Sequence, residues 1–147
     1  MSIFDSFSIN ASGLTAERYR MDVISENIAN IDTTRTEDGT PYRRKLVTFE
    51  EKGKNVTFAS ALVKAKGDYI GGGVRVGKTY EDTETEMKMV YDPSHPDADE
   101  NGYVTYPNVN VITEMTDLID ASRSYEANAT AFSASKSMAV KGLEMAQ

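Results

Sequence analysis

Apolar residues recur at helical spacing in a stretch near each end of the chain. In the first stretch, over residues 3–31, they lie three, four or seven positions apart, which places them along one side of a helix. This line consists of Phe4, Phe7, Ala11, Leu14, Met21, Ile24, Ile28 and Ile31. Arg18 and Ser25 interrupt the strict heptad, so we expect an imperfect coiled coil that docks on another helix. A bend at Gly13 could set the first ten residues apart as a short helix of their own.

The second stretch, over residues 109–145, contains no proline and predicts a longer helix. Its main line, at alternating steps of four and three, is Leu118, Ser122, Tyr125, Ala129, Phe132, Lys136, Ala139 and Leu143, and a second line is Ile112, Met115 and Ile119. Pro107, with Asn108 and Asn110 as candidate caps, predicts where this helix begins. Alanine and serine are frequent over residues 121–139, and such small residues let helix axes approach closely.

The stretch between the helices, over residues 32–107, holds all four prolines and eight of the ten glycines. Three strands are predicted there, at Tyr42–Phe49, Val74–Val76 and Met87–Tyr91. The stretch Asn55–Lys66 fits either a strand or a short helix. The polar stretches Thr33–Thr40 and Asp92–Gly102 are expected to be flexible.

These elements predict a mainly α fold with a small β module. We expect an N-terminal helix over residues 1–31, a β-rich insert over 32–107 and a C-terminal helix over 108–147. The two long terminal helices are expected to pack as a coiled-coil-like pair. A pair of this length exposes more apolar surface than it covers, which predicts assembly with other subunits.

The formal net charge of the 147 residues is −7. It is divided evenly among the three parts, with −2 over residues 1–31, −3 over 32–110 and −2 over 111–147. No basic face large enough to bind several phosphates is visible, which argues against nucleic acid and direct lipid binding. The sequence has no cysteine and no apolar run of about 18 residues, so it predicts neither disulfides nor a transmembrane helix.

Two short charged runs stand out within the insert. Arg43, Arg44 and Lys45 form a basic cluster, and residues 81–86 contain four carboxylates. The two runs could form salt bridges within or between subunits, and simple solvation of both is an equally good interpretation.

Three features were considered as candidate chemistry. Asp97–Gly102 resembles the first half of a calcium-binding loop, but position 12 is Asn108 instead of the bidentate glutamate, which favours a polar turn. His95 is the only histidine and lacks a partner for general-base or metal chemistry, which favours a surface position. Gly71–Gly73 is not followed by the residues of a phosphate-binding loop and favours a hinge or bulge before a strand. We therefore expect no enzyme activity, no cofactor and no metal site.

Several segments carry motifs that are specific in combination. They are Ser25–Thr33, Thr34–Thr36, Pro41–Lys45, Asp92–Ala98, Gly102–Val104, Tyr106–Asn110, and the C-terminal residues Met115, Ala121 and Arg123 with Tyr125–Asn128. The first resembles the Ala-Asn-x-x-Thr signature of bacterial flagellar rod and hook proteins, and the last resembles their Arg-x-Tyr-Glu-Ala-Asn helix. Taken together, the segments resemble the family of flagellar basal-body rod protein C. Only residues 52–88 match no motif.

The resemblance implies a structural subunit of the flagellar proximal rod, the hollow drive shaft that transmits torque across the periplasm. It implies a helical core built from both chain termini with the β module outside it. It also implies export through the flagellar type III apparatus, which agrees with the absence of a cleavable signal in residues 1–5. The implied partners are other rod proteins, further copies of the chain and the adaptor that joins the rod to the membrane ring.

The helix lines and the motifs together predict the subunit-interface residues. They are Phe4, Phe7, Leu14, Met21, Ile24, Ile28, Asn30, Thr33, Tyr42, Arg43, Arg44, Ile112, Met115, Leu118, Ile119, Arg123, Tyr125, Glu126, Asn128, Phe132 and Leu143. Phe4 and Phe7 could also serve in export recognition. The alternatives are a hook-like or other exported axial component, a calcium-dependent binding module resting on Asp97–Gly102, and a small enzyme, for which the sequence offers no catalytic set.

Overall fold

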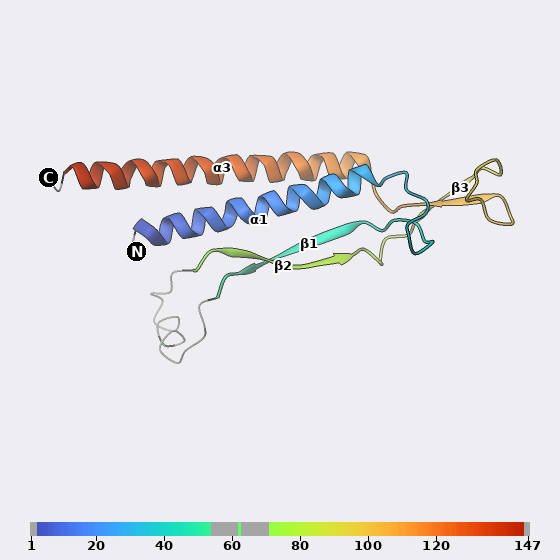
Figure 1. Ribbon diagram of the computed structural model, residues 1–147, viewed down its shortest axis with the longest axis horizontal. Coiled ribbons are helices and arrows are strands. Elements are labelled where there is room, and N and C mark those ends of the chain that lie inside the picture. The colour runs from blue at the N-terminus through green and yellow to red at the C-terminus, as the bar shows by residue number, and fades with distance from the viewer. Residues whose placement is uncertain (1–2, 54–61, 63–70, 146–147) are drawn as a thin grey trace. The chain divides into compact units, whose positions relative to one another are not determined.

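The computed structural model describes residues 3–53, 62 and 71–145, and Figure 1 shows the elements they form. The elements are α1 (Ile3–Ala29), β1 (Lys45–Glu51), β2 (Val74–Glu81), β3 (Lys88–Tyr91), β4 (Tyr103–Tyr106) and α3 (Val111–Glu144). The strands form two sheets of two strands each, β1 with β2 and β3 with β4. Two long terminal helices with a small β insert confirm the predicted fold class.

Helix α1 continues without interruption through Gly13, so the bend considered there does not occur. It ends at Ala29, two residues before the predicted end. The next residue, Asn30, closes the helix because its Nδ2 donates to the backbone O of Glu26 at 2.9 Å. The side chain of Thr33 then donates to Oδ1 of Asn30 at 3.1 Å. Local side-chain bonds of this kind compete with helical ones and explain the early end.

Helix α3 begins at Val111 because Asn110 acts as its N-cap. Oδ1 of Asn110 accepts hydrogen bonds from the backbone N of Ile112 at 3.0 Å and of Thr113 at 3.5 Å. Of the two candidate caps, Asn110 therefore has this role. The predicted start at residue 109 was two residues early.

The chain divides into two compact units, each of which contains a segment of both helices. Unit 1 comprises residues 1–19, 48–77 and 121–147. Within it, α1 and α3 run antiparallel, with the rings of Phe7 and Phe132 in edge-to-face contact at 5.1 Å. Ala16 and Ala121 are 2 % and 0 % exposed in this unit. Small side chains thus occupy the buried positions here, as the Ala- and Ser-rich composition of α3 predicted.

Unit 2 comprises residues 20–47 and 78–120. Its buried apolar side chains are Val23 and Ile24 of α1, Tyr42 and Val104. Val104 belongs to β4, which pairs antiparallel with β3 in the register Lys88↔Tyr106 to Tyr91↔Tyr103. The sequence did not predict β4, because its four residues follow directly on a turn-rich stretch and are too few for a clear alternation.

Several strand boundaries and loops differ from the predictions. Strand β1 begins at Lys45 instead of Tyr42, and β2 extends beyond the predicted Val76 to Glu81. The two stretches expected to be flexible are held by turns. In the first, the backbone N of Thr36 donates to the O of Thr40 at 2.9 Å, and in the second, the backbone N of Ala98 donates to the O of His95 at 3.1 Å. The ambiguous stretch Asn55–Lys66 lies, apart from Leu62, outside the described residues.

Candidate functional site

Asn27 of α1 is the centre of a buried polar cluster in unit 2. Its side chain is 1 % exposed. Its Nδ2 donates to the backbone O of Lys45 at 2.9 Å and to Oε2 of Glu114 at 3.0 Å. Its Oδ1 accepts from the backbone N of Lys45 at 2.8 Å and from the hydroxyl of Tyr42 at 2.9 Å. An amide has two donor and two acceptor positions, so Asn27 is fully satisfied and ties α1 to β1 and α3.

Glu114 is the charged member of the cluster and is also 1 % exposed. Its Oε1 accepts from Nε of Arg44 at 2.5 Å. The same guanidinium reaches Asp117 at 3.2 Å through Nη2, and Arg20 of α1 lies 3.8 Å from Asp117. A buried carboxylate needs such partners because an unpaired one would cost several kcal/mol. Within the described residues, the side chain of Arg44 therefore forms its ion pairs with Glu114 and Asp117 of α3, and none with the acidic run 81–86.

Asn108 extends the cluster to the turn that follows β2. Its Oδ1 accepts from the backbone N of Arg44 at 2.9 Å, and its Nδ2 donates to the backbone O of Asp82 at 2.9 Å. The carboxylate of Asp82 in turn accepts from the hydroxyl of Thr85 at 2.7 Å, and this bond is the main cause that lowers the pKa of Asp82. We call Asn27, Tyr42, Arg44, Asn108 and Glu114 the polar cluster.

The hydroxyl of Tyr42 titrates far from its usual range. Burial is the largest cause that raises the pKa of Tyr42, and together with the nearby carboxylates of Glu26, Glu114 and Glu81, in that order, it brings this pKa to about 12. Glu26 also forms an ion pair with Lys45 at the rim of the cluster. The phenol therefore stays protonated and keeps donating to Asn27 at all physiological pH values.

The sequence did not single out Asn27, Asn108 and Glu114 as a group. Asn27 belongs only to the motif Ser25–Thr33 in the sequence analysis, and Asn108 is there a candidate cap and position 12 of the calcium-loop comparison. Glu114 has a usable signal, because it precedes the buried Ala121 by seven residues and so lies on the same side of α3. A charged residue on a buried side requires a partner elsewhere in the chain.

The predicted interface residues fall into three groups by exposure. Ile112, Met115, Ile119, Arg123, Glu126 and Leu143 are exposed; Phe7, Leu14, Met21, Ile28, Asn30, Thr33, Arg43, Arg44, Leu118, Tyr125, Asn128 and Phe132 are half-buried; Ile24 and Tyr42 are buried. The side chain of Phe4 lies outside what the structure describes. The exposed second line of α3 is thus separate from the side that α3 turns toward α1.

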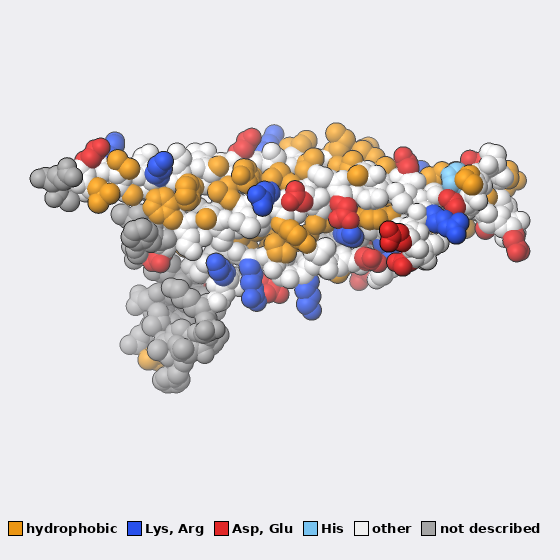
Figure 2. Space-filling model, viewed as in Figure 1, with side chains coloured by type: hydrophobic (Ala, Val, Ile, Leu, Met, Phe, Trp, Pro, Cys, Tyr) orange, Lys and Arg blue, Asp and Glu red, His pale blue; other side chains and the backbone are white. Residues whose placement is uncertain are grey.

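Large apolar side chains are unusually exposed along α3. In unit 2, Ile112, Met115 and Ile119 are 78 %, 53 % and 53 % exposed, and in unit 1 Met138 and Leu143 are 65 % and 70 % exposed. Figure 2 shows hydrophobic side chains at the surface along this helix. Among the described residues, six hydrophobic side chains are buried and fifteen large ones are exposed, so apolar surface is available to partners.

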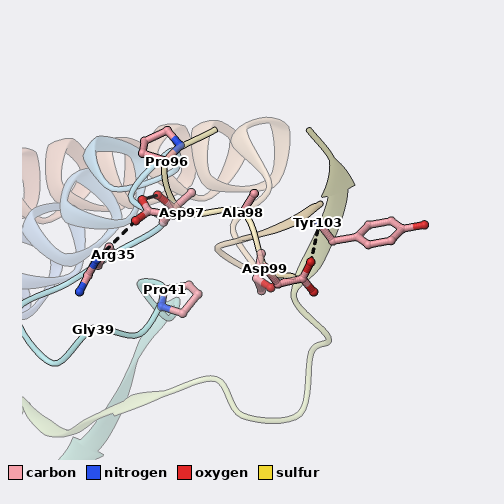
Figure 3. A pocket seen from close by; sticks show the side chains of 10 residues that line it. Arg35, Gly39, Pro41, Pro96, Asp97, Ala98, Asp99 and Tyr103 are labelled. Carbon is pink, nitrogen blue, oxygen red and sulfur yellow. Dashed lines mark hydrogen bonds and ion pairs between the residues drawn. The ribbon is translucent and has the colours of Figure 1, made fainter. Parts of the chain in front are cut away.

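The candidate calcium loop forms one wall of a surface pocket of about 360 Å³ in unit 2 (Figure 3). Its Asp97 accepts from the hydroxyl of Thr34 at 2.8 Å and lies 3.8 Å from Arg35. Oδ1 of Asp99 accepts from the backbone N of Tyr103 at 2.8 Å. These carboxylates thus hold a turn and a neighbouring loop. No group of three or more His, Cys, Asp or Glu side chains within residues 3–53, 62 and 71–145 is arranged to hold a metal ion.

The other two candidate features have packing roles. His95 accepts from the backbone N of Asp97 at 3.1 Å through Nδ1, and its ring lies 6.4 Å from that of Tyr106. In unit 1, Gly73 has φ +94°, and a Cβ there would lie 2.3 Å from Oγ of Ser12. That hydroxyl accepts from the backbone N of Val74 at 3.0 Å, so the glycine allows the start of β2 to approach α1. None of the described helices is long and apolar enough to cross a membrane.

Two antiparallel terminal helices with exposed apolar lines, held to a β insert by a satisfied polar cluster, define a structural subunit suited to assembly. Two family models match the chain, "Flagella basal body rod protein" over residues 7–35 and "Flagellar basal body rod FlgEFG protein C-terminal" over residues 100–145. The flagellar basal-body rod protein FlgC of Bacillus subtilis is 45 % identical over 99 % of both chains. That of Borreliella burgdorferi is 45 % identical over 100 % of this chain and 99 % of its own. That of Salmonella typhimurium is 40 % identical over the full length of both.

The chain therefore belongs to the FlgC family of flagellar basal-body rod proteins. It is a structural subunit of the flagellar rod. The family resemblance inferred from the sequence is confirmed, and the hook-like, calcium-binding and enzymatic alternatives find no support in these similarities.

Proposed function

We propose that the chain joins its neighbours in the proximal rod through the outward apolar line of α3. The observation that supports this is the line Ile112, Met115 and Ile119, at steps of three and four, on a helix whose opposite side already holds Glu114 and Ala121. Helix α3 thus packs one side within the subunit and leaves the other side for a partner. Burial of this line on assembly stabilises the contact at roughly 25 cal/mol per Å² of apolar surface.

The proposal extends to the setting of the rod. The subunit passes through the flagellar type III export apparatus and takes its place in the periplasmic part of the basal body. Its neighbours there are other rod proteins, further copies of the chain and the adaptor that connects the rod to the membrane ring. The resemblance of the chain to rod proteins supports this placement. In cells that lack a working flagellar export apparatus, immunoblots of cell fractions should find the chain in the cytoplasm only; a periplasmic pool would contradict it.

The apolar line is tested by replacing Met115 and Ile119 with serine in the full chain. Both side chains are half exposed, so the double variant should keep the circular dichroism and the urea midpoint of the isolated subunit. Its incorporation into basal bodies should fall by about tenfold or more, because a loss of about 2 kcal/mol of apolar burial exceeds the 1.4 kcal/mol per factor of ten.

The matched control is Thr116→Ser, an exposed and conservative change in the same helical turn. It should incorporate as the unmodified chain does. Quantitative immunoblots of purified basal bodies provide the measurement. If Met115→Ser with Ile119→Ser reached the unmodified level, the outward line of α3 would not be an assembly surface.

A further inference from the structure

The connection between β3 and β4 contains the pair Asn101–Gly102. The chain has eight asparagines, and Asn101 is the only one that a glycine follows. Asparagine is a thermolabile residue, and it deamidates fastest before glycine, because the backbone nitrogen of a glycine reaches the side-chain amide without hindrance from a side chain of its own. Asn101 is also exposed, so water has access to it. The sequence and the exposure together make Asn101 the asparagine to consider for chemical modification.

The backbone of this turn favours glycine at position 102. The φ of Gly102 is +81°, in the left-handed region that glycine adopts without strain. A Cβ here would lie 3.0 Å from the ring of Tyr91 and 3.2 Å from Cβ of Pro93. A larger residue, which would slow deamidation, therefore fits this position poorly. The labile pair is thus a consequence of the turn geometry as long as residue 101 is an asparagine.

The same turn holds the nitrogen that would react. The backbone N of Gly102 donates to the backbone O of Asp99 at 3.0 Å, and its O accepts from the backbone N of Asp92 at 2.9 Å. Oδ1 of Asp99 accepts from the backbone N of Asn101 and of Tyr103, both at 2.8 Å, and Figure 3 shows the second of these bonds. The N–H of Gly102 is therefore directed at a carbonyl oxygen and not at the side chain of Asn101.

Deamidation would begin with an attack of this nitrogen on Cγ of Asn101. The bond from the backbone N of Gly102 to Cγ forms, the bond from Cγ to Nδ2 breaks, and Nδ2 leaves as ammonia with the proton of the backbone nitrogen. Water then opens the cyclic imide at either carbonyl, which yields aspartate or isoaspartate without any oxidant or reductant. The attacking nitrogen must turn toward Cγ and release its proton, so its hydrogen bond to Asp99 has to break first.

We propose that Asn101 is a deamidation site that the closed β3–β4 turn protects and that reacts with water when the turn opens. In the folded chain, the rate of deamidation then follows the fraction of molecules in which the turn is open, because local opening precedes the reaction. The isoaspartate product adds a methylene group to the backbone between the two nitrogens that Oδ1 of Asp99 now binds. This proposal concerns the chain itself and does not depend on its assembly.

The test incubates the full chain in mildly alkaline buffer, once folded and once unfolded in guanidinium chloride. Mass spectrometry of proteolytic fragments gives the rate at each asparagine. In the unfolded chain, Asn101 should deamidate faster than each of the other seven asparagines. In the folded chain, the rate at Asn101 should be at least about tenfold lower than in the unfolded chain. Faster deamidation of another asparagine in the unfolded chain, or equal rates at Asn101 in both states, overturns the proposal.

The substitution Asp99→Ala tests the protection by the turn. It removes the carboxylate that binds two backbone nitrogens, so the rate at Asn101 in the folded chain should rise by about fivefold or more. Glu100→Ala, at the neighbouring exposed position, is the control and should leave the rate unchanged. Each rate is divided by that of the same variant in guanidinium chloride, which cancels direct effects of the neighbouring side chain, and circular dichroism should show intact helices in both variants. No rise in Asp99→Ala, or an equal rise in Glu100→Ala, overturns the proposal.

Discussion

A single asparagine side chain connects several elements of unit 2 by hydrogen bonds. Asn27 lies on α1, and its amide bonds reach β1, Tyr42 and Glu114 of α3. An apolar residue at this position would fill the space but leave the backbone of Lys45 and the hydroxyl of Tyr42 without partners. Buried donors and acceptors left in this way cost about 1–3 kcal/mol each. We therefore expect position 27 to tolerate neither a hydrophobic side chain nor a polar one that lacks the two donor and two acceptor positions of an amide.

Replacement of Asn27 by alanine should lower the free energy of unfolding by about 3 kcal/mol, because several buried groups lose their bonds at once. Urea unfolding followed by circular dichroism measures the change. Asn101→Ala, at an exposed turn position, serves as the control and should stay within about 0.5 kcal/mol. A cost below about 1 kcal/mol for Asn27→Ala would show that the network adjusts around the loss.

The tyrosine of the polar cluster gives the protein an alkaline limit. The pKa of Tyr42 is about 12 in the folded chain and close to 10 when unfolded, so the folded state holds the proton more tightly. Its contribution to stability is complete below pH 10 and is lost as the pH rises toward 12. Ultraviolet titration of the phenols should show one late-titrating tyrosine that is missing in Tyr42→Phe. If the variant titrated like the unmodified chain, the late phenol would belong to another tyrosine.

At the level of elements, the sequence predicted the helices well and their contact surfaces less well. Apolar spacing identified α1 and α3 to within two residues at the ends that were compared. The buried positions of the helices, however, include Gly13, Ala16, Ala121 and Ser135, which a search for large apolar residues passes over. Conversely, large residues such as Ile112, which belongs to the proposed assembly surface, are exposed. Periodicity shows that a helix is amphipathic, and side-chain size decides which side lies closest to its neighbour.

The polar contacts between elements were beyond prediction for a different reason. Asn27, Arg44 and Glu114 are separated by up to 87 positions, and no local pattern shows that they meet. The strand β4 was missed because only its pairing with β3 defines it. Long-range pairs of this kind become visible only when the fold is known.

Gly13 determines how closely the two helices approach in unit 1. A Cβ at this position would lie 2.9 Å from Oδ1 of Asn128 on α3. Alanine is normally better than glycine inside a helix by about 1 kcal/mol. Gly13→Ala alone should therefore give no net gain, because the amide of Asn128 must move. The double variant Gly13→Ala with Asn128→Ala should recover the gain relative to Asn128→Ala alone.

A double-mutant cycle based on urea midpoints measures this coupling. Additive effects of the two changes would mean that Gly13 and Asn128 do not restrict each other. A favourable effect of Gly13→Ala by about 1 kcal/mol in the unmodified background would lead to the same conclusion.

At the level of the whole molecule, the ratio of buried to exposed apolar side chains is that of a subunit of an assembly and not of a protein that functions alone. The described residues bury few large apolar side chains and expose many, and several of the exposed ones are methionines. Thioether oxidation depends on access, so methionines report directly on which surfaces are covered. Peroxide should oxidise Met115 and Met138 in the isolated subunit at nearly the rate seen in the urea-unfolded chain.

In intact basal bodies both methionines should oxidise at least about tenfold more slowly, because neighbouring subunits cover the side chains that are exposed in the free subunit. Mass spectrometry of tryptic peptides provides the rates. Equal oxidation of Met115 in both states would place the subunit contacts on another surface. Because the unmodified chain is used throughout, this measurement does not depend on whether a variant folds.

The antiparallel pairing of α1 and α3 also sets an order in time. Synthesis makes residues 3–29 first, and the helix that covers them is made almost last, from residue 111 onward. During most of translation, α1 therefore lacks α3 as its packing partner. The two helices can pack only by closing a loop of about 80 residues, which has a low probability and is slow. In a nascent or newly released chain, the two terminal helices are thus not yet packed against each other. For the proposed passage through the flagellar export apparatus, this late closure keeps the chain in an open form that can enter a narrow channel.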